Sequence, residues 1–253
     1  MQKLTALILS YNEEANLPDC LQSVQWADEI FVVDSFSTDR SVEIAESFGA
    51  RVAQHEYLNN AAQKNWAIPQ CSHEWIVIVE ADERMTPELR QEIEQLFEQP
   101  MQHDAYFVYR RNFVFGREVR HGGWDRDKAA RLIHRHCRYG ERQLAAEVVL
   151  DKPAGWLRGR MPHYPYREFD QLYAKFQRYT SWGAIELNKQ GVRANWVKIL
   201  LHPLWGFFKQ YVLRRGFLDG YIGLILAGQT ASYIFTKYAK LWYIQQIEEK
   251  VVR

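Results

Sequence analysis

The sequence is poor in the features that mark secreted, disulfide-bonded or membrane-spanning proteins. Its three cysteines are odd in number and far apart, so they predict neither a disulfide framework nor a cysteine metal site. The longest stretch without a charged residue, 220–236, has seventeen residues and three glycines, whereas a spanning helix needs roughly 20 mostly apolar residues. Residues 1–9 are too short an apolar run for a signal peptide. These absences predict a reduced, cytoplasmic setting.

Net charge is also nearly absent, because 32 basic residues face 31 acidic ones. Whole-chain charge therefore gives no argument for a nucleic-acid partner, and none is expected, although local asymmetry still matters. No internal repeat or low-complexity linker interrupts the chain. Its 253 residues are enough for one large domain, or for one domain with an appendage.

Strand-like and helix-like segments alternate through the first hundred residues. The strand-like segments are 4–9, 29–34, 51–54 and 75–79. Thr86 followed by Pro87 predicts a helix start, Gly49 predicts a helix end, and Ser37 or Thr38 is a candidate N-cap. The alternation predicts an α/β fold with a doubly wound, mostly parallel sheet.

Carboxylates gather where the fourth strand-like segment ends, at Glu80, Asp82 and Glu83. Ligands bind at the carboxyl ends of strands in open α/β sheets. In an extended chain Glu80 and Asp82 share a face, which predicts a site for a hard divalent cation that also binds substrate phosphates. A solvated acidic turn is the alternative. Polar loops at 12–13 and 34–39 follow earlier strands, and this clustering favours a functional edge.

The pattern changes after Pro100, where short strand-like runs and a turn at 115–117 predict an α+β section. This section is rich in arginine, histidine and tryptophan, and residues 122–125 predict a flexible loop carrying Trp124. Such a composition can bind phosphate and stack on a sugar ring. A solvated basic face is an equal alternative.

The chain is expected to be helical from Glu168 onward. Between Leu187 and Leu218 there are six basic residues and no acidic one, interleaved with tryptophan, phenylalanine and leucine. This mixture predicts helices that lie in an anionic membrane interface, where each basic residue contributes roughly 1 kcal/mol. Packing against the sheet, with lysine and arginine stems along apolar surface, is the alternative. The expected domains are 1–165 and 166–253.

Three motifs together resemble those of glycosyltransferase family 2. They are Leu-Ile-Leu-Ser-Tyr-Asn-Glu-Glu at 7–14, Val-Asp-Ser-Phe-Ser-Thr-Asp at 33–39 and Glu-Ala-Asp-Glu at 80–83. They match the landmarks of that family in order and at normal spacing. Residues 123–124, 131–132, 147, 215–220 and 237–242 also resemble the branch that includes the lipopolysaccharide-core β-glucosyltransferases. The resemblance covers nearly the whole chain.

The resemblance implies a GT-A fold and inverting transfer of a hexose, glucose first, from a UDP-sugar. The implied nucleotide-binding residues are Ser10, Asn12, Glu13, Asp34, Lys64 and Asn65. Asp82 would be the acid beside a bound Mg²⁺ or Mn²⁺. Glu80 stands where the first acid of the motif is usually shorter, so it ligates the metal directly or through water.

The chemistry of such a transfer needs two kinds of group. Negative charge builds on the leaving nucleoside diphosphate, and Arg131, with Arg126, could stabilise it. The acceptor hydroxyl needs a base, for which Glu147 is the first candidate and Asp125 the reserve. Glu147 lies in an apolar stretch, 144–149, where Ala146 replaces the histidine usual in this branch. A structural salt bridge is the alternative role for Glu147.

The leading interpretation is an enzyme held peripherally at the inner face of the cytoplasmic membrane, acting on a lipid-linked or lipopolysaccharide acceptor. A sugar nucleotidyltransferase is a second interpretation, but residues 10–16 contain neither the glycine nor the basic residue that its phosphate loop needs. A non-catalytic nucleotide-sugar-binding or membrane scaffold protein is a third, and the altered Glu80 and Ala146 favour it. Nucleotide or membrane binding without turnover would distinguish this scaffold.

Overall fold

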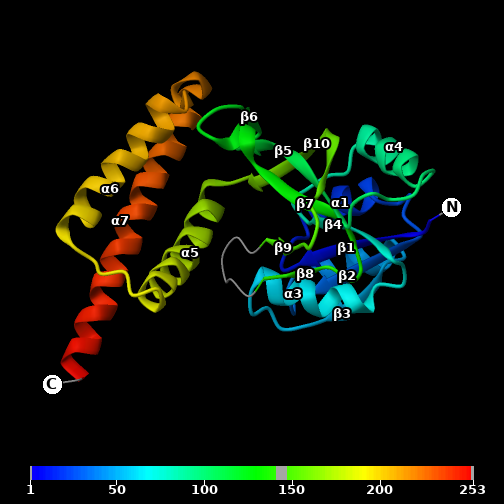
Figure 1. Cartoon of the computed structure of the whole chain (residues 1–253), viewed down its shortest axis with the longest axis horizontal. Coiled ribbons are helices and arrows are strands. Elements are labelled where there is room, and N and C mark those ends of the chain that lie inside the picture. The colour runs from blue at the N-terminus through cyan, green and yellow to red at the C-terminus, as the bar shows by residue number, and fades with distance from the viewer. Residues whose placement is uncertain (1, 141–146, 252–253) are drawn as a thin grey trace. The chain divides into compact units, whose positions relative to one another are not determined.

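The computed structural model describes residues 2–140 and 147–251. They form two compact units, which are considered separately below (Figure 1). The first unit comprises Met1–Arg111 and Arg126–Tyr164, and the second comprises Asn112–Asp125 and Pro165–Arg253. The second unit therefore includes a segment near the middle of the chain, which the expected boundary at residue 165 assigned to the first.

The first unit begins with the expected alternation of strands and helices. Its elements in this part are β1 (Leu4–Ser10), α1 (Leu17–Ser23), β2 (Glu29–Asp34), α2 (Ser41–Ser47), β3 (Arg51–Gln54), α3 (Asn60–Ala67), β4 (Trp75–Glu80) and α4 (Pro87–Leu96). β1 pairs in parallel with both β2 and β4, and β2 pairs in parallel with β3. The predicted α/β fold is confirmed.

An antiparallel half continues the same sheet. Its strands are β5 (Ala105–Val114), β6 (Arg117–Val119), β7 (Lys128–His134) and β10 (Gly155–Tyr166), whereas β8 (Arg138–Tyr139) and β9 (Val148–Val149) pair separately. The strand order is β10-β5-β7-β4-β1-β2-β3, and β6 pairs with β5. The runs 105–109 and 112–115, predicted as separate strands, belong to one long strand and its turn. The turn places Phe115 and Gly116 at positive φ, as a tight hairpin requires.

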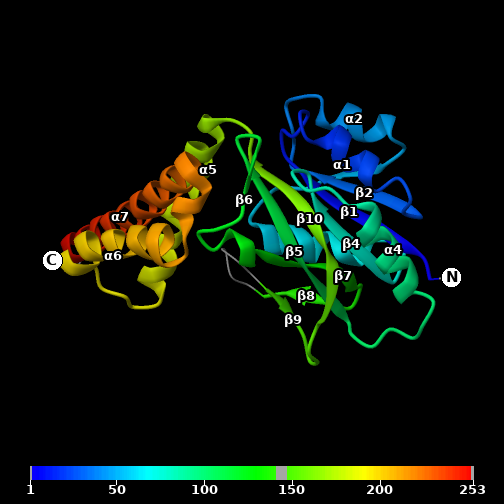
Figure 2. The same ribbon diagram turned by 90° about the horizontal axis from the view of Figure 1, so that it is seen from above.

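Two apolar layers cover the two faces of the sheet, whose strands are drawn as arrows in Figure 2. Along β4 the side chains alternate, so that Val77 and Val79 pack with Leu21 of α1 and Leu89 of α4. Ile76 and Ile78 pack on the other face with Ala67 of α3, among others. A strand that is buried on both faces needs an unbroken apolar run, and this explains the composition of β4.

Local sequence signals account for several helix ends. Thr86 caps α4 by accepting a hydrogen bond from Leu89 N at 3.3 Å, and Gly49 follows α2 at a φ of 74°. The prediction that Ser37 or Thr38 caps α2 is wrong, because that helix begins at Ser41 without a side-chain cap. Ser37 and Thr38 are instead hydrogen-bonded to Asp34 and Asn12.

The second unit is mainly helical. It contains α5 (Phe169–Lys189), α6 (Trp196–Phe208), a π-helical turn (Lys209–Leu213), a 3₁₀ turn (Gly216–Asp219) and α7 (Gly220–Val251). α6 lies along α7 in both views, and α7 also packs against α5. A small core joins Val114 and Val119 to Leu172 and Leu226. Across residues 2–140 and 147–251, each helix lacks either the length or the apolar character to cross a membrane.

Candidate active site

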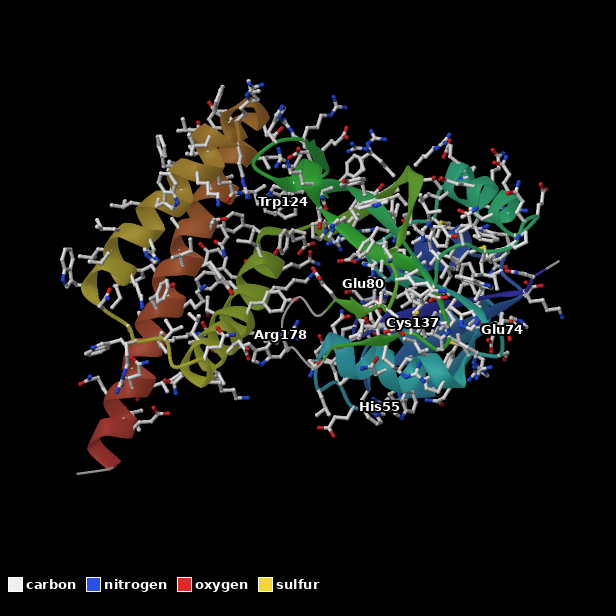
Figure 3. The ribbon with its side chains drawn as sticks, viewed as in Figure 1. His55, Glu74, Glu80, Trp124, Cys137 and Arg178 are labelled. Carbon is white, nitrogen blue, oxygen red and sulfur yellow. The ribbon has the colours of Figure 1, made fainter. Side chains whose placement is uncertain are left out.

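Several candidate residues meet at the carboxyl edge of the parallel strands. Ser10 at the end of β1 pairs with Asp34 at the end of β2. Glu80, which ends β4 and is labelled in Figure 3, pairs with Leu9. The topology therefore brings the ends of three strands together, as predicted for a ligand-binding edge.

Asp34 and Asn12 fasten the two loops that follow β1 and β2. Asp34 is fully buried, and its Oδ2 accepts a hydrogen bond from Ser37 N at 2.9 Å. Asn12, at a φ of 52°, accepts one from Thr38 N at 2.8 Å and donates its own N–H to Ser37 Oγ at 2.8 Å. The two predicted nucleotide contacts are thus joined through Ser37.

Ser10 presents an unused polar group at this edge. It is 4% exposed, and its Oγ is buried without a hydrogen-bond partner among the described residues. Glu13 differs, because its carboxylate accepts a hydrogen bond from Asn16 Nδ2 at 2.7 Å and its N–H donates to Ser41 Oγ at 2.9 Å. Leaving a buried hydroxyl unpaired costs about 1–3 kcal/mol. A polar ligand at this edge would supply the hydrogen-bond partner that Ser10 Oγ lacks.

A buried network of charges follows β4. Arg131 Nη2 lies 2.6 Å from Glu83 Oε1 and 3.1 Å from Glu80 Oε1. Lys64 Nζ lies 3.2 Å from the same Glu80 oxygen. Arg110 completes the network, with Nη1 3.2 Å from Glu83 Oε1. Glu80 and Glu83 thus hold three cations, of which Arg110 also pairs with Asp127, and this fixes the cations in position at the strand edge.

The network stabilises the charged forms of Glu80 and Arg131. Burial alone would raise the pKa of Glu80, but Arg131 and Lys64 hold it well below its usual range. Burial opposes the charge of Arg131 as well, but Glu83 and Glu80 raise the pKa of Arg131 above its ordinary value. The pKa of Lys64 is lowered by its burial, and Glu80 offsets part of that effect. Glu80 and Arg131 therefore form a preformed pair of opposite charges at this edge.

Asp82 faces a different group, the imidazole of His163. His163 Nε2 lies 3.5 Å from Asp82 Oδ2, and its Nδ1 lies 3.9 Å from Asp127 Oδ2. Asp127 is fixed in turn by Arg110 Nη2 at 2.6 Å. The side chains of Asp82 and His163 are both largely buried. One carboxylate and one imidazole therefore converge from β10 and the turn after β4.

The expectation that Glu80 and Asp82 share a face because the chain is extended is corrected by the structure. β4 ends at Glu80, and the chain then turns. Glu83 N donates to Glu80 O at 2.8 Å, and Glu83 Oε2 accepts from Glu80 N at 3.1 Å. Glu83, predicted to point away, is therefore the residue that shares Arg131 with Glu80, while Asp82 pairs with His163.

The donor atoms at Asp82 and His163 suit a divalent cation that also binds substrate phosphates. Among residues 2–140 and 147–251, no group of three or more His, Cys, Asp or Glu side chains is arranged to hold a metal by itself. Mg²⁺ usually takes only one or two carboxylates and completes its shell with water and phosphate oxygens, and Mn²⁺ favours carboxylate and water in the same way. Asp82 fits that pattern as the single carboxylate, with an imidazole nitrogen of His163 beside it at 3.5 Å. Glu80 is already engaged by Lys64 and Arg131.

Asn65 holds the short strand β8 in place. Its Nδ2 donates to Tyr139 O at 2.8 Å, and its Oδ1 accepts from Tyr139 N at 2.8 Å. Tyr139 also lies beneath Lys64, whose Nζ is 4.8 Å from the ring centroid. The amide of Asn65 is therefore occupied by the backbone, and its role toward a nucleotide stays a prediction.

The two candidate bases lie outside this network of described contacts. Glu147 is exposed just before β9, and its carbonyl accepts a hydrogen bond from Gly140 N at 3.0 Å. The apolar stretch predicted at 144–149 therefore does not bury Glu147, and residues 144–146 lie outside the described part of the chain. Asp125 is also exposed, in the 3₁₀ turn Trp124–Arg126 of the second unit. Arg126 is exposed as well.

The sequence reasoning missed His163 and Asp127. His163 occupies an inward position of β10, in line with the buried Leu157 and Met161. A histidine at a buried alternate position of a strand is a signal for a polar partner, and this pattern could have identified it. Asp127 lies between the predicted base Asp125 and the start of β7, with no local pattern to single it out.

Comparisons with known proteins identify the family of the chain. Residues 5–157 match the model described as Glycosyl transferase family 2. An uncharacterized glycosyltransferase of Rickettsia bellii is 31% identical over 95% of this chain and 86% of its own length. The lipopolysaccharide core biosynthesis glycosyltransferase LpsC of Rhizobium meliloti is 28% identical over 93% of each chain. The crystal structure of S. aureus TarS is similar with a TM-score of 0.46 and 15% identity, over 90% of this chain and 54% of the TarS chain.

Proposed function

Because this chain belongs to glycosyltransferase family 2, we propose that it is an inverting hexosyltransferase that moves glucose from UDP-glucose to a lipopolysaccharide-core or lipid-linked saccharide. The relative LpsC is named for lipopolysaccharide core biosynthesis and matches over 93% of each chain, which supports the acceptor class. The glucose and the inverting course follow from the resemblance of the motifs. The observation that carries the proposal is the edge where Ser10 Oγ lies unpaired and Asp82 faces His163.

The residues at this edge divide the work of donor binding. Ser10, with the loops that Asn12 and Asp34 fasten, holds the nucleoside, and Glu13 braces the first loop. Asp82 and His163 would hold Mg²⁺ or Mn²⁺, which stabilises the negative charge of the leaving diphosphate when bound.

Arg131 and Lys64 supply fixed positive charge next to the leaving group. Glu80 and Glu83 hold both cations in place before the donor binds. Such preorganised groups cost no reorganisation when charge develops in the transition state. Asn65 supports this arrangement by holding Tyr139 beneath Lys64.

The acceptor hydroxyl loses its proton to a carboxylate, and we assign Glu147 first and Asp125 second. Both carboxylates belong to exposed residues, so each can meet a large saccharide acceptor from solvent. A base that takes the proton on the opposite side of the sugar from the leaving group produces inversion. Substituting each acid separately by its amide distinguishes the two. Only substitution of the residue that acts as the base should lower kcat on the order of 10²–10⁴-fold.

The second unit supports a peripheral position at the inner face of the cytoplasmic membrane. Trp196, Leu204 and Trp205 of α6 are 68%, 66% and 56% exposed. Exposed apolar side chains next to basic residues are typical of an interfacial helix. The anionic membrane surface would then bring the enzyme to its lipid-linked acceptor.

A nucleotide-release assay across UDP-, GDP- and dTDP-sugars, with Mn²⁺, Mg²⁺ or EDTA, tests this function. We expect release from UDP-glucose that EDTA abolishes. Release from a GDP- or dTDP-sugar alone would reject UDP-glucose as the donor. Release that EDTA leaves unchanged would reject the requirement for a divalent metal. If the whole panel is silent, calorimetry with UDP follows, and absence of UDP binding there would reject the donor site.

A further inference from the structure

The second unit contains a pocket to which the proposed sugar transfer assigns no role. Its volume is about 330 Å³, and it lies between α6, the π-helical turn and α7. Its lining residues are His202, Trp205, Gly206, Lys209, Gln210, Arg214, Thr230, Ile234, Lys237 and Tyr238. Three of them are cations and none is an acid. The volume falls at the lower end of the about 300–1,000 Å³ that is typical of small-molecule sites.

Lys237 is a half-buried cation whose charge the protein does not neutralise. Within the described part of the chain, its Nζ has neither a hydrogen bond nor an ion pair, and it lies 5.4 Å and 5.3 Å from the ring centroids of Tyr233 and Tyr238. Burial lowers the pKa of Lys237, and no acid offsets that effect. Lys240, one turn further along α7, instead donates to Thr180 Oγ1 and Ser181 Oγ at 2.8 Å.

The acid nearest in sequence to the pocket cations is engaged elsewhere. Asp219 is the only acidic residue between positions 187 and 247. Its Oδ2 accepts a hydrogen bond from His121 N at 2.8 Å, and its Oδ1 lies 2.9 Å from His121 Nδ1. Buried or half-buried cations without a protein partner favour an anionic ligand.

Arg214 is held beside the pocket by its own backbone and by a glycine. Gly122 N donates to Arg214 O at 2.8 Å. A Cβ atom at Gly123 would lie 2.6 Å from Arg214 Nη1, so the absence of a side chain there lets the guanidinium lie against the loop. An arginine positioned in this way offers the forked donor geometry that suits phosphate oxygens.

An exposed apolar stripe adjoins the pocket on α6. It consists of Leu201, Leu204, Trp205 and Phe208, which are 49%, 66%, 56% and 44% exposed. Trp205 belongs to both features, because it lines the pocket and lies in the stripe. A cationic pocket bordered by apolar surface complements a molecule with an anionic head and a hydrocarbon tail.

We propose that this pocket binds the phosphate headgroup of an anionic lipid, with Lys209, Arg214 and Lys237 around the phosphate and the acyl chains along the stripe. The proposal deepens the membrane part of the proposed function and rests on it, but it is independent of the donor site in the first unit. A soluble phosphate compound shares the headgroup chemistry. It would have no use for the stripe, and this favours the lipid.

Partition of the full-length protein into phosphatidylcholine vesicles, with and without phosphatidylglycerol, tests the site. The pocket variant is Lys209→Gln combined with Lys237→Gln. The control variant, Lys189→Gln with Lys198→Gln, removes the same charge from the same unit outside the pocket. We expect the pocket variant to lose about 30-fold in partition to the anionic vesicles, since each basic residue at such a surface contributes about 1 kcal/mol. The control variant should lose clearly less than the pocket variant, because neither lysine lines the pocket and Lys198 Nζ already donates to Arg193 O at 2.6 Å.

Equal losses of partition in the two variants would reject the lipid site in favour of general charge attraction. No loss in either variant would reject a lipid site altogether. Saturable binding of inorganic phosphate that needs Lys209 and Lys237, with unchanged vesicle partition, would replace the lipid with a soluble ligand. If the pocket variant does not fold, Lys209→Glu at an exposed position serves instead. UDP binding and nucleotide release by the pocket variant should match those of the natural chain, so failure of the donor site is measured separately.

Discussion

At the scale of single residues, the site separates two tasks that the sequence places side by side. Glu80 and Glu83 bind cations of the protein, whereas Asp82 faces His163. The turn after β4 produces this separation, because it rotates successive carboxylates toward different neighbours. Removal of these acids, which look alike in sequence, is therefore expected to have different effects.

Asp82→Ala is expected to abolish metal-dependent turnover while the fold persists. Loss of a metal-side carboxylate removes several kcal/mol of transition-state stabilisation, which is at least about a hundredfold in rate. The fold should persist because the ion contact of Asp82 with His163 is long, at 3.5 Å. UDP release with Mn²⁺ measures the effect, and Asp151→Asn at an exposed position is the control. Full turnover in the Asp82 variant would exclude it from the metal site.

Glu83→Gln is expected to destabilise the first unit by about 3–5 kcal/mol, because it leaves Arg131 and Arg110 with a missing buried partner. Glu83 is fully buried and lies 2.6 Å from Arg131. Glu94→Gln, which removes a surface pair with Arg90 at 2.8 Å, should cost about 0.5 kcal/mol or less. Urea unfolding measures both values. Similar losses of unfolding free energy in the two variants would show that the buried network contributes no more to stability than a surface ion pair.

Glu29→Gln tests the acid dependence of stability. Burial opposes its charge, but hydrogen bonds from Thr5, Ser72 and Arg51 lower the pKa of Glu29 from 4.5 to about 2. The depressed pKa stabilises the folded state above about pH 4.5, and this stabilisation is lost as the pH falls toward 2. The variant should lose about 1–2 kcal/mol at pH 7 after solvent screening is considered.

The loss caused by Glu29→Gln should shrink between pH 4.5 and 2, since Glu29 itself becomes protonated there. Urea unfolding at pH 7 and at pH 3 measures the difference, with Glu98→Gln at an exposed position as the control. A difference that stays constant over this range would show that the hydrogen-bonded charge of Glu29 is not its cause.

At the scale of elements, the sequence predicted best where one local pattern decides the structure. The apolar run of β4 and the Thr86-Pro87 start of α4 predicted those elements because burial on both faces and capping are local requirements. The same reasoning failed at Ser37, whose hydroxyl bonds to Asp34 and Asn12 N rather than to a helix. A residue with several partners in reach cannot be assigned from its neighbours alone.

The site could be predicted only in part for the same reason. The place of Glu80 at the strand edge could be predicted because parallel strands end at one edge, whereas Ser10 and Asp34 were predicted from the resemblance of the motifs. His163 was not, because β10 approaches Asp82 from far along the chain, and β10 pairs with the sheet beyond β5. Long-range contacts between an acid and a histidine leave no periodic trace in sequence. The positions of Lys64 and Arg110 depend on their long-range contacts with Glu80 and Glu83 in the network around Arg131, and these contacts have no local sequence pattern.

Helix α7 offers a test of close packing at the element scale. A Cβ atom at Gly223 would lie 1.8 Å from the carbonyl oxygen of Gly216, whereas one at Gly228 would meet nothing within 4 Å. Gly223→Ala should therefore destabilise the second unit by about 1–3 kcal/mol through overpacking. Gly228→Ala in the same helix should stabilise it by about 0.5–1 kcal/mol. Thermal unfolding of the two variants measures both changes in stability. Equal changes would reject the close approach of Gly223 to the carbonyl oxygen of Gly216.

At the scale of the whole molecule, charge and apolar surface are distributed unevenly over a nearly neutral chain. The net charge is +1, but the stretch between Leu187 and Leu218 contains six basic residues and no acid. Exposed apolar side chains concentrate in the same stretch and in α7. Solvent-exposed leucine and tryptophan are unfavourable in water but stabilise an interfacial state. This distribution predicts that membrane association, rather than folding, depends on those side chains.

Leu204→Ser is expected to lower partition into anionic vesicles about tenfold or more, because insertion of a leucine side chain into an apolar phase contributes about 1.5–3 kcal/mol. Leu58→Ser in the first unit is the matched control, since Leu58 is 64% exposed and Leu204 is 66% exposed. Neither variant should change the midpoint of thermal unfolding by more than a few degrees, because both side chains already contact water. If Leu204→Ser lowers the unfolding midpoint and leaves vesicle partition unchanged, the apolar face of α6 serves packing within the protein and not membrane binding.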